Sequence, residues 1–248
     1  MTVPLLEIEG LCKSFGAIQA VNDVSFEVRE GEVLGIIGPN GSGKSTLFNC
    51  ILGQLKPNVG EIRFAGRSVT DLPPVEISRR GIGRTFQMLQ VFDGMTVRDN
   101  LIAAAQEHRG GLVSRLFMAA HAGLSARAEE MLDFFHLSHL ADQLAGGLSF
   151  GQQKLLDIAM AFMAEPRLIL LDEPAGSVSP TMLGELKGML ERLNRVHGAT
   201  FAVIEHNMEF VMGLSHRVLV LAQGSVLAVG APEEIQANPE VMEAYLGD

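Results

Sequence analysis

The sequence predicts an α/β protein with a parallel-sheet core, an N-terminal antiparallel β layer and an inserted α-helical subdomain. Three observations lead to this fold class. Four short segments are almost wholly apolar, three segments near the N-terminus are rich in β-branched or aromatic residues, and one long stretch lacks strand signals. With 248 residues, 47% of them apolar, the chain is long enough to bury a large core.

The antiparallel layer is predicted from three short segments of the N-terminal part. Turn-forming stretches such as REGE and KPNVGE separate them, as is typical of neighbouring strands. The three segments are 5–9 (LLEIE), 24–28 (VSFEV) and 61–64 (EIRF).

The parallel core is predicted from four segments that are apolar at nearly every position, as strands covered on both faces are. Between the second and the third, Pro180 opens a stretch with apolar residues at helical spacing, and Gly198 stands where a C-terminal cap is expected. This arrangement predicts a β-α-β crossover. The four segments are 33–37 (VLGII), 168–171 (LILL), 200–204 (TFAVI) and 217–221 (RVLVL).

The helical subdomain is predicted from residues 96–165, which are rich in Ala, Leu and Met and contain no comparable strand. This stretch begins with the helix-start pattern Thr96 to Asp99. Residues 107–130 have no clean period, so we expect loop and short helix there and assign them no role. We therefore predict one domain, 1–248, in which 1–95 and 163–248 form the core and 96–162 the helical subdomain.

The charge and cysteine content exclude several classes of protein. With 29 acidic and 19 basic residues the net charge is −10, which argues against a nucleic-acid-binding protein. Cys12 and Cys50 are far apart and fit neither a disulfide framework nor a zinc site. We find no secretion signal at the start and no apolar run near the ~20 residues of a membrane span. Any membrane association is expected to go through a partner.

A glycine-rich phosphate-binding motif directly follows VLGII and precedes the helical run TLFNCILG. Its glycines let backbone N–H groups turn toward a polyphosphate, and the helix N-terminus adds positive potential. Lys44 would reach the outer phosphates, and the Ser45 hydroxyl would bind Mg²⁺. The motif comprises Gly38, Pro39, Asn40, Gly41, Ser42, Gly43, Lys44 and Ser45.

Two adjacent acids, Asp172 and Glu173, end the apolar segment LILL. A buried carboxylate without a partner costs several kcal/mol, on the order of the penalty for an unpaired buried ion, so we expect a cation beside it. If a nucleotide lies at this edge of the sheet, Asp172 would hold its Mg²⁺. Glu173 would then orient and deprotonate an attacking water, typically worth ~10²- to 10⁴-fold in rate.

Two further patterns in the sequence point to other kinds of site. Residues 147–151 (GLSFG) match the nucleophile elbow of α/β-hydrolases, and Asp172 and His206 follow in triad order. The elbow requires a preceding strand, which LADQLAGG does not predict, so Ser149 is better explained as the cap of a helix and a second anion site. His136 and His139 lack a third nearby ligand and are assigned no metal.

Taken together, these residues resemble the ATP-binding-cassette (ABC) ATPases over nearly the whole chain, which implies a P-loop NTPase (RecA-like) fold. Phe15 in KSFG matches the aromatic residue that stacks on adenine. Gln87 in RTFQ matches the glutamine that senses Mg²⁺ and the transmembrane partner, and His206 matches the switch histidine. Residues 38–46 match the Walker A loop, 148–152 the signature LSGGQ and 168–173 Walker B with its catalytic glutamate.

The resemblance implies a head-to-tail dimer around two Mg·ATP, in which the signature of one subunit contacts the γ-phosphate held by the other. The implied catalytic residues are Glu173, His206, Lys44 and Gln87, and the implied Mg²⁺ ligands are Ser45, Gln87 and Asp172. The implied nucleotide-binding residues are Phe15, Gly38, Pro39, Asn40, Gly41, Ser42, Gly43, Lys44, Ser45, Thr46, Ser149, Gly151 and Gln152.

Three positions depart from the common family pattern. Phe150 replaces a glycine of the signature, although relatives in branched-chain amino-acid importers commonly carry an aromatic residue there. Ser179 stands where most relatives have an aspartate, which leaves the contacts across the dimer open. Phe15 replaces the commoner tyrosine and keeps the stacking face.

The final stretch, 230–248, with RTFQMLQVFDGMTVRDNL and FGQQK, looks specifically like the ATPase of bacterial branched-chain amino-acid uptake systems. This implies permease subunits, an indirect link to a solute-binding protein, and a peripheral position on the cytoplasmic face of the inner membrane. A homodimer and a heterodimer with a sister ATPase both stay open, as does the transported solute. The alternative function is a soluble ABC ATPase that acts in complex assembly.

Overall fold

The computed structural model describes residues 3–85, 91–108, 118–176 and 178–246. Within these residues the core is a six-stranded sheet in the order β10-β9-β3-β8-β7-β6. The neighbours from β9 to β6 pair in parallel, and β10 pairs antiparallel with β9. The strands are β3 (Val33–Ile37), β6 (Ile82–Arg84), β7 (Leu168–Asp172), β8 (Thr200–Ile204), β9 (Arg217–Ala222) and β10 (Ser225–Gly230).

The central strands of this sheet are apolar throughout because both of their faces are buried. In β8, Phe201 and Val203 belong to one hydrophobic cluster, whereas Ala202 and Ile204 belong to another. Such alternation follows from the two-residue period of a strand. The predicted parallel core is therefore confirmed.

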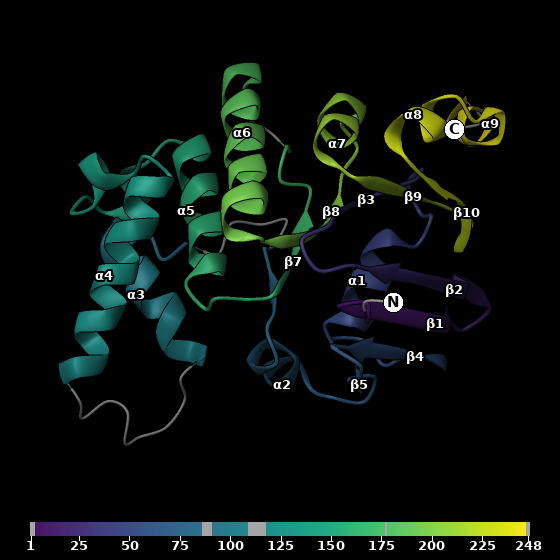
Figure 1. The fold of residues 1–248 in the computed structure, drawn as a ribbon, viewed down its shortest axis with the longest axis horizontal. Helices are drawn as coiled ribbons and strands as arrows, with labels where there is room; N and C mark the ends of the chain where they lie inside the picture. The colour runs from purple at the N-terminus through teal and green to yellow at the C-terminus, as the bar shows by residue number, and fades with distance from the viewer. Residues whose placement is uncertain (1–2, 86–90, 109–117, 177, 247–248) are drawn as a thin grey trace.

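A second sheet of the described chain, in the order β2-β1-β4-β5, covers one side of the core. Helix α1 (Lys44–Ile51) lies between the two sheets, and its Leu47, Phe48 and Ile51 are fully buried there (Figure 1). Because α1 starts at the carboxyl end of β3, this packing fixes the loop between them. The strands are β1 (Leu6–Phe15), β2 (Ile18–Val28), β4 (Val59–Phe64) and β5 (Arg67–Ser68).

The other face of the core sheet is covered by helices, most of which come from the segment between β6 and β7 (Figure 1). Their apolar residues form one cluster with Ile169, Leu171 and Phe201 of the sheet. These helices therefore share a core with the sheet, and the domain boundaries within the chain stay a prediction. The helices are α3 (Val97–His108), α4 (Met118–Phe134), α5 (Phe150–Phe162) and α6 (Pro180–His197), with 3₁₀ turns η2 (Ser138–Leu140) and η3 (Ala145–Gly147).

Shorter helices complete the fold. Helix α2 (Pro74–Arg79) precedes β6, while α7 (Met208–Leu214), α8 (Pro232–Gln236) and α9 (Pro239–Leu246) follow β8 and the last strands. A third apolar cluster joins Val211 of α7, Ile235 of α8 and Val241 of α9 to β9. In the described part of the chain, we find no helix with the length and apolar character that crossing a bilayer demands.

The helix start predicted at Thr96 to Asp99 is confirmed, whereas the sequence did not predict every strand of the fold. Thr96 Oγ1 accepts from the Asp99 N–H at 3.0 Å, and Thr96 donates to the Asp99 carboxylate. Strands β1 and β2 are longer than predicted because their polar residues point outward on one face. The short β6 and the antiparallel β10 were not predicted, since neither is a buried apolar run.

Candidate functional site

The loop between β3 and α1 has a backbone that requires glycine. Gly38 has φ +152° and Gly43 has φ +101°. A Cβ atom at Gly38 would lie 2.0 Å from the carbonyl oxygen of Leu221, and one at Gly43 would lie 2.2 Å from that of Ala20. Because neither oxygen is on a flexible side chain, a larger residue would distort the loop. Residues 38–43 therefore form a narrow loop directly before the N-terminus of α1, which we call the cradle.

Lys44 is the first residue of α1 and only 6% exposed. Its Nζ donates to the carbonyl oxygens of Gly38 at 2.7 Å and Pro39 at 3.0 Å. Burial lowers the pKa of Lys44, and the negative charges of Glu173 and Asp172 partly oppose this shift. The ammonium group thus lies in the cradle, within the electrostatic field of the two predicted acids.

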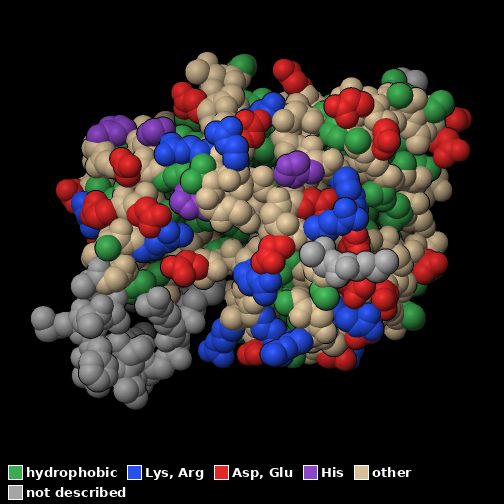
Figure 2. Space-filling view, viewed as in Figure 1, with side chains coloured by type: hydrophobic (Ala, Val, Ile, Leu, Met, Phe, Trp, Pro, Cys, Tyr) green, Lys and Arg blue, Asp and Glu red, His purple; other side chains and the backbone are tan. Residues whose placement is uncertain are grey.

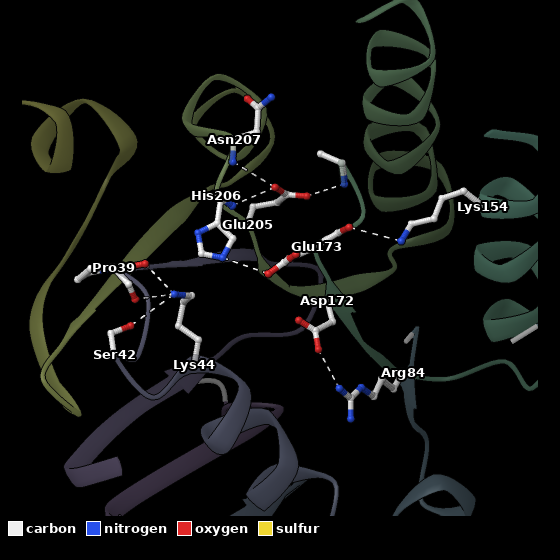
Figure 3. Close-up of polar contacts among 12 residues, drawn as sticks. Pro39, Ser42, Lys44, Arg84, Lys154, Asp172, Glu173, Glu205, His206 and Asn207 are labelled. Atoms are coloured by element: carbon white, nitrogen blue, oxygen red, sulfur yellow. Dashed lines mark hydrogen bonds and ion pairs between the residues drawn. The ribbon is translucent and has the colours of Figure 1, made fainter. Parts of the chain in front are cut away.

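Asp172 ends β7 as a buried carboxylate, 4% exposed, and its described partner is Arg84. Nη2 of Arg84 lies 2.8 Å from Oδ2 of Asp172, and Nη1 donates to the side-chain oxygens of Asn49 and Gln54 at 3.0 Å each. A buried acid here was expected to require a cation, and a guanidinium that ties β7 to α1 supplies one (Figure 3).

Glu173 and His206 come together at the carboxyl ends of β7 and β8. Nε2 of His206 lies 3.1 Å from Oε1 of Glu173, with side chains 42% and 28% exposed. Glu173 has φ +50°, and its N–H donates to the carbonyl oxygen of Ile204 at 2.9 Å. The turn therefore presents the carboxylate beside the imidazole (Figure 3). Both side chains are partly exposed, so water from solvent can reach them.

The N-terminus of α5 is a separate, exposed feature. Ser149 Oγ accepts from the Gln152 N–H at 3.4 Å, and Gln152 Oε1 accepts from the Ser149 N–H at 2.9 Å. This capping box satisfies two backbone donors of the first turn. Within the described residues, no hydrogen bond joins Ser149 or Gly151 to Lys44 or Glu173. The two helix N-termini predicted as anion sites therefore lie on different helices, and their binding of anions stays a prediction.

Comparisons with known proteins decide the family. Residues 21–176 match the family model described as ABC transporter, and residues 225–248 match the one described as branched-chain amino acid ATP-binding cassette transporter. The chain is also 42% identical, over 100% of both chains, to the high-affinity branched-chain amino acid transport ATP-binding protein LivG of Salmonella typhimurium. The chain belongs to the ABC transporter family. Within that family it stands with the branched-chain amino acid transport ATP-binding proteins.

Solved structures show the same ABC ATPase fold. The ADP conformation of an ATP-binding cassette of an ABC transporter is 36% identical and superposes with a TM-score of 0.89 over 100% of both chains. A dimeric bacterial ABC transporter cassette is 27% identical, with a TM-score of 0.79 over 92% of this chain and 98% of that one. The protein is thus an ABC ATPase, which binds ATP and ADP and hydrolyses ATP to drive transport. The relatives do not support the alternative of a soluble ATPase without a transporter.

The structure places the other predicted positions of this ABC ATPase as follows. Ser45 and Asn40 are exposed at the cradle, and Thr46 follows in the first turn of α1. Phe15 ends β1 with 47% of its surface exposed, and the Nζ of Lys13 lies 5.4 Å from its ring centroid. Gln87 lies outside the described residues. Their roles stay predictions.

Ser179, the unusual position after Walker B, has a local function in this ABC ATPase. Its Oγ accepts from the Met182 N–H at 3.3 Å and caps α6. Serine and aspartate are comparable N-caps, so the departure from the family pattern preserves the start of this helix.

The hydrolase interpretation is wrong, because the residues before Ser149 form the 3₁₀ turn η3 and not a strand. Among the described residues, no three His, Cys, Asp or Glu side chains are grouped so that they could hold a metal ion, and His136 and His139 have no third ligand of these types there. On the face that Figure 2 shows, acidic and basic side chains are interspersed and form no continuous basic surface.

Three polar residues of the site were not found from the sequence: Arg84, Lys154 and Glu205. Arg84 ends a three-residue strand, and its partner Asp172 lies 88 residues away in the chain. Glu205 could have been found, because it follows the apolar run FAVI just as Asp172 follows LILL. The burial argument used for Asp172 applies equally to that carboxylate.

Proposed function

We propose that this chain is the ATP-hydrolysing subunit of an importer for branched-chain amino acids. The observation that carries the mechanism is the 3.1 Å contact between Glu173 and His206, next to a cradle that contains the Lys44 ammonium. The branched-chain assignment is supported by the full-length similarity to LivG and by the match of residues 225–248.

The cradle residues would bind the phosphates of ATP. Lys44 would exchange its hydrogen bonds with the carbonyl oxygens of Gly38 and Pro39 for the outer phosphate oxygens. Burial lowers the pKa of Lys44. The negative charge of a bound phosphate would oppose this shift and favour the protonated lysine. Phe15, which is half exposed at the end of β1, would stack on the adenine.

Asp172 and Ser45 are suited to hold Mg²⁺. Both offer oxygen ligands, which this hard cation prefers, and the described contact of Asp172 engages only Oδ2. Bound Mg²⁺ would supply neutralisation of phosphate charge. Gln87 is proposed to contact the same cation.

Glu173 would act as the general base. Its carboxylate would accept a proton from the water that attacks the γ-phosphorus, the bond from that phosphorus to the β–γ bridging oxygen would break, and ADP would leave. The imidazole of His206 would hold the water and a γ-phosphate oxygen. The 3.1 Å contact keeps the two groups adjacent before the substrate binds.

A second cassette would complete each ATP site. Ser149, Gly151 and Gln152 lie at an exposed helix N-terminus, which is favourable for a phosphate group. We therefore propose that this end contacts the ATP held by the other subunit of a dimer, as the existence of a dimeric relative supports.

A cavity of about 430 Å³ is the proposed docking site for the permease. It opens between α2, β6 and the helices α3 and α5, and Arg84 and Phe92 of its lining flank the segment that contains Gln87. A permease segment in this cavity would hold the protein at the cytoplasmic face of the membrane. Its lining residues are Leu52, Gln54, Pro74, Val75, Ser78, Arg79, Ile82, Gly83, Arg84, Phe92, Ala104, Asp157, Met160 and Ala161.

The variant Glu173→Gln tests this function in the native host. It should bind ATP, lose at least about 100-fold in turnover and trap an ATP-bound dimer, since the base is removed while the shape is kept. Uptake of labelled leucine, isoleucine and valine should fall to the level of a deletion strain, and permease subunits should co-purify in mild detergent. The matched control is Glu185→Gln, at an exposed site of α6. Normal turnover would remove Glu173 from its role, and unchanged uptake would contradict the importer.

A further inference from the structure

The loop between β8 and α7 contains a buried carboxylate that the proposed mechanism does not use. Glu205 directly precedes His206 and is 3% exposed. Its Oε1 accepts from the Ala175 N–H at 2.5 Å, and its Oε2 accepts from the N–H groups of His206 and Asn207 at 3.0 Å and 3.2 Å (Figure 3). Hydrogen bonds to an ionised acceptor are stronger than neutral ones. One side chain therefore joins two segments that are 30 residues apart.

These two segments carry the proposed water-activating pair. Ala175 lies in the turn that contains Glu173, and Asn207 caps α7 directly after His206. The turn is strained, because a non-glycine residue at φ +50° costs on the order of 1 kcal/mol or more. Strained backbone keeps its geometry only where neighbours hold it. The hydrogen bonds of Glu205 are placed to do so, and thereby to fix the 3.1 Å contact between Glu173 and His206.

A buried lysine extends this arrangement to α5. Lys154 is 3% exposed, and its Nζ donates to the carbonyl oxygen of Glu173 at 3.4 Å. Burial lowers the pKa of Lys154 and raises that of Glu205, and nearby carboxylates, Asp157 foremost, favour the charged lysine. Opposite charges in one buried region offset part of each other's desolvation penalty. The turn is thus attached to the helix that begins after Ser149.

We propose that Glu205 is a positioning residue that holds the Glu173 turn and the His206 loop at the separation needed for water activation, and that Lys154 connects them to α5. This proposal rests on the proposed roles of Glu173 and His206. A consequence is that α5 would act on two sites. Its first turn would contact the ATP of a second cassette, and its Lys154 would help to position Glu173, the general base of its own chain.

The variant Glu205→Gln tests the positioning role in the full chain. Glutamine has the same shape but only one acceptor oxygen, so it cannot accept from both segments. We expect kcat to fall at least about 10-fold, because ~1 Å of misplacement can cost ~100-fold in rate. KM and the Kd for ATP should not change. Turnover is expressed per ATP-binding site, counted by binding stoichiometry, so that a partly unfolded sample does not mimic the effect.

The matched control is Glu209→Gln, at an exposed position in the first turn of α7, which removes the same charge nearby and should leave kcat unchanged. A kcat per site within about twofold of the parent in Glu205→Gln overturns the proposal. If Glu205→Gln does not fold, Glu205→Asp replaces it, since the shorter side chain cannot span both segments. A normal kcat in that variant has the same meaning.

Glu173→Gln, measured in parallel, separates this inference from the proposed function. Normal turnover in Glu173→Gln defeats both. Loss of turnover there with normal turnover in Glu205→Gln defeats only the positioning role.

The link to α5 is tested by Lys154→Met, alone and combined with Glu205→Gln. If Lys154 and Glu205 act together on the Glu173 turn, the kcat per site of the double variant should be hardly lower than that of the more impaired single variant. Losses that multiply in full would show independent action and would overturn the connection through Lys154.

Discussion

Helices α1 and α5 both begin where a phosphate group is proposed to bind, but their first turns are built differently. The N-cap of α1 is Gly43 in a left-handed conformation, without a side-chain cap, and Lys44 is buried beside it. The N-cap of α5 is Ser149, which forms a capping box with Gln152, and Phe150 next to it is 47% exposed. The first end is enclosed by its own chain, whereas the second is complete as a helix and open to another molecule. The difference supports the proposal that one cassette would supply one whole phosphate cradle and one half of a second site.

The largest effect is expected from Lys44→Ala. Removal of the ammonium group takes away the positive charge of the enclosed end, so ATP hydrolysis should fall at least about 100-fold, in line with the loss of a phosphate clamp. ATP binding to the isolated cassette should also weaken, measured by calorimetry. The control is Lys56→Ala, because that side chain is 76% exposed. Unchanged ATP affinity would show that the enclosed end does not bind the nucleotide.

A smaller and more selective effect is expected from Ser149→Asp in the Glu173→Gln background. Aspartate caps a helix as well as serine does, but its charge opposes a phosphate group. The variant should bind ATP normally, while the ATP-dependent dimer weakens at least about 10-fold, or ~1.4 kcal/mol, by analytical ultracentrifugation. Ser149→Asn, a neutral cap, should dimerise almost normally. A normal dimer of Ser149→Asp would break the distinction between the two helix ends.

The smallest effect is expected from Ser179→Ala, at a third capped helix end. Loss of the hydrogen bond from the Met182 N–H should lower the free energy of unfolding by about 1 kcal/mol. Urea denaturation measures this, with Ser179→Asp as the control that keeps a cap. An unchanged unfolding free energy would mean that this hydroxyl does not stabilise α6.

The sequence was most informative where a single segment carries its own signal. The strands β3, β7 and β8 are apolar at nearly every position because both faces are buried, and the cradle requires glycine for its backbone. Ser149 and Thr96 were recognisable as caps from residues within one turn. Each of these signals spans fewer than about ten residues, so no knowledge of the tertiary structure was needed.

The features that were missed depend on contacts between distant segments. Arg84 has significance only because β6 pairs with β7 and brings it to Asp172. Lys154 is recognisable only once α5 packs beside the turn after β7. Strand β10 is partly exposed and pairs antiparallel, so it lacks the apolar run of its neighbours. Local patterns could therefore predict the fold and the main motifs, but not the partners of the buried charges.

The arginine that pairs with Asp172 also lines the wall of the 430 Å³ cavity. Gln54, one of its other partners, lines the same wall. Arg84 therefore contacts Asp172 at the carboxyl end of β7 and is also part of the lining of the cavity. A molecule that fills the cavity can therefore contact a side chain that is hydrogen-bonded to β7, and a displacement of Arg84 from the cavity side would act on Asp172 through that hydrogen bond.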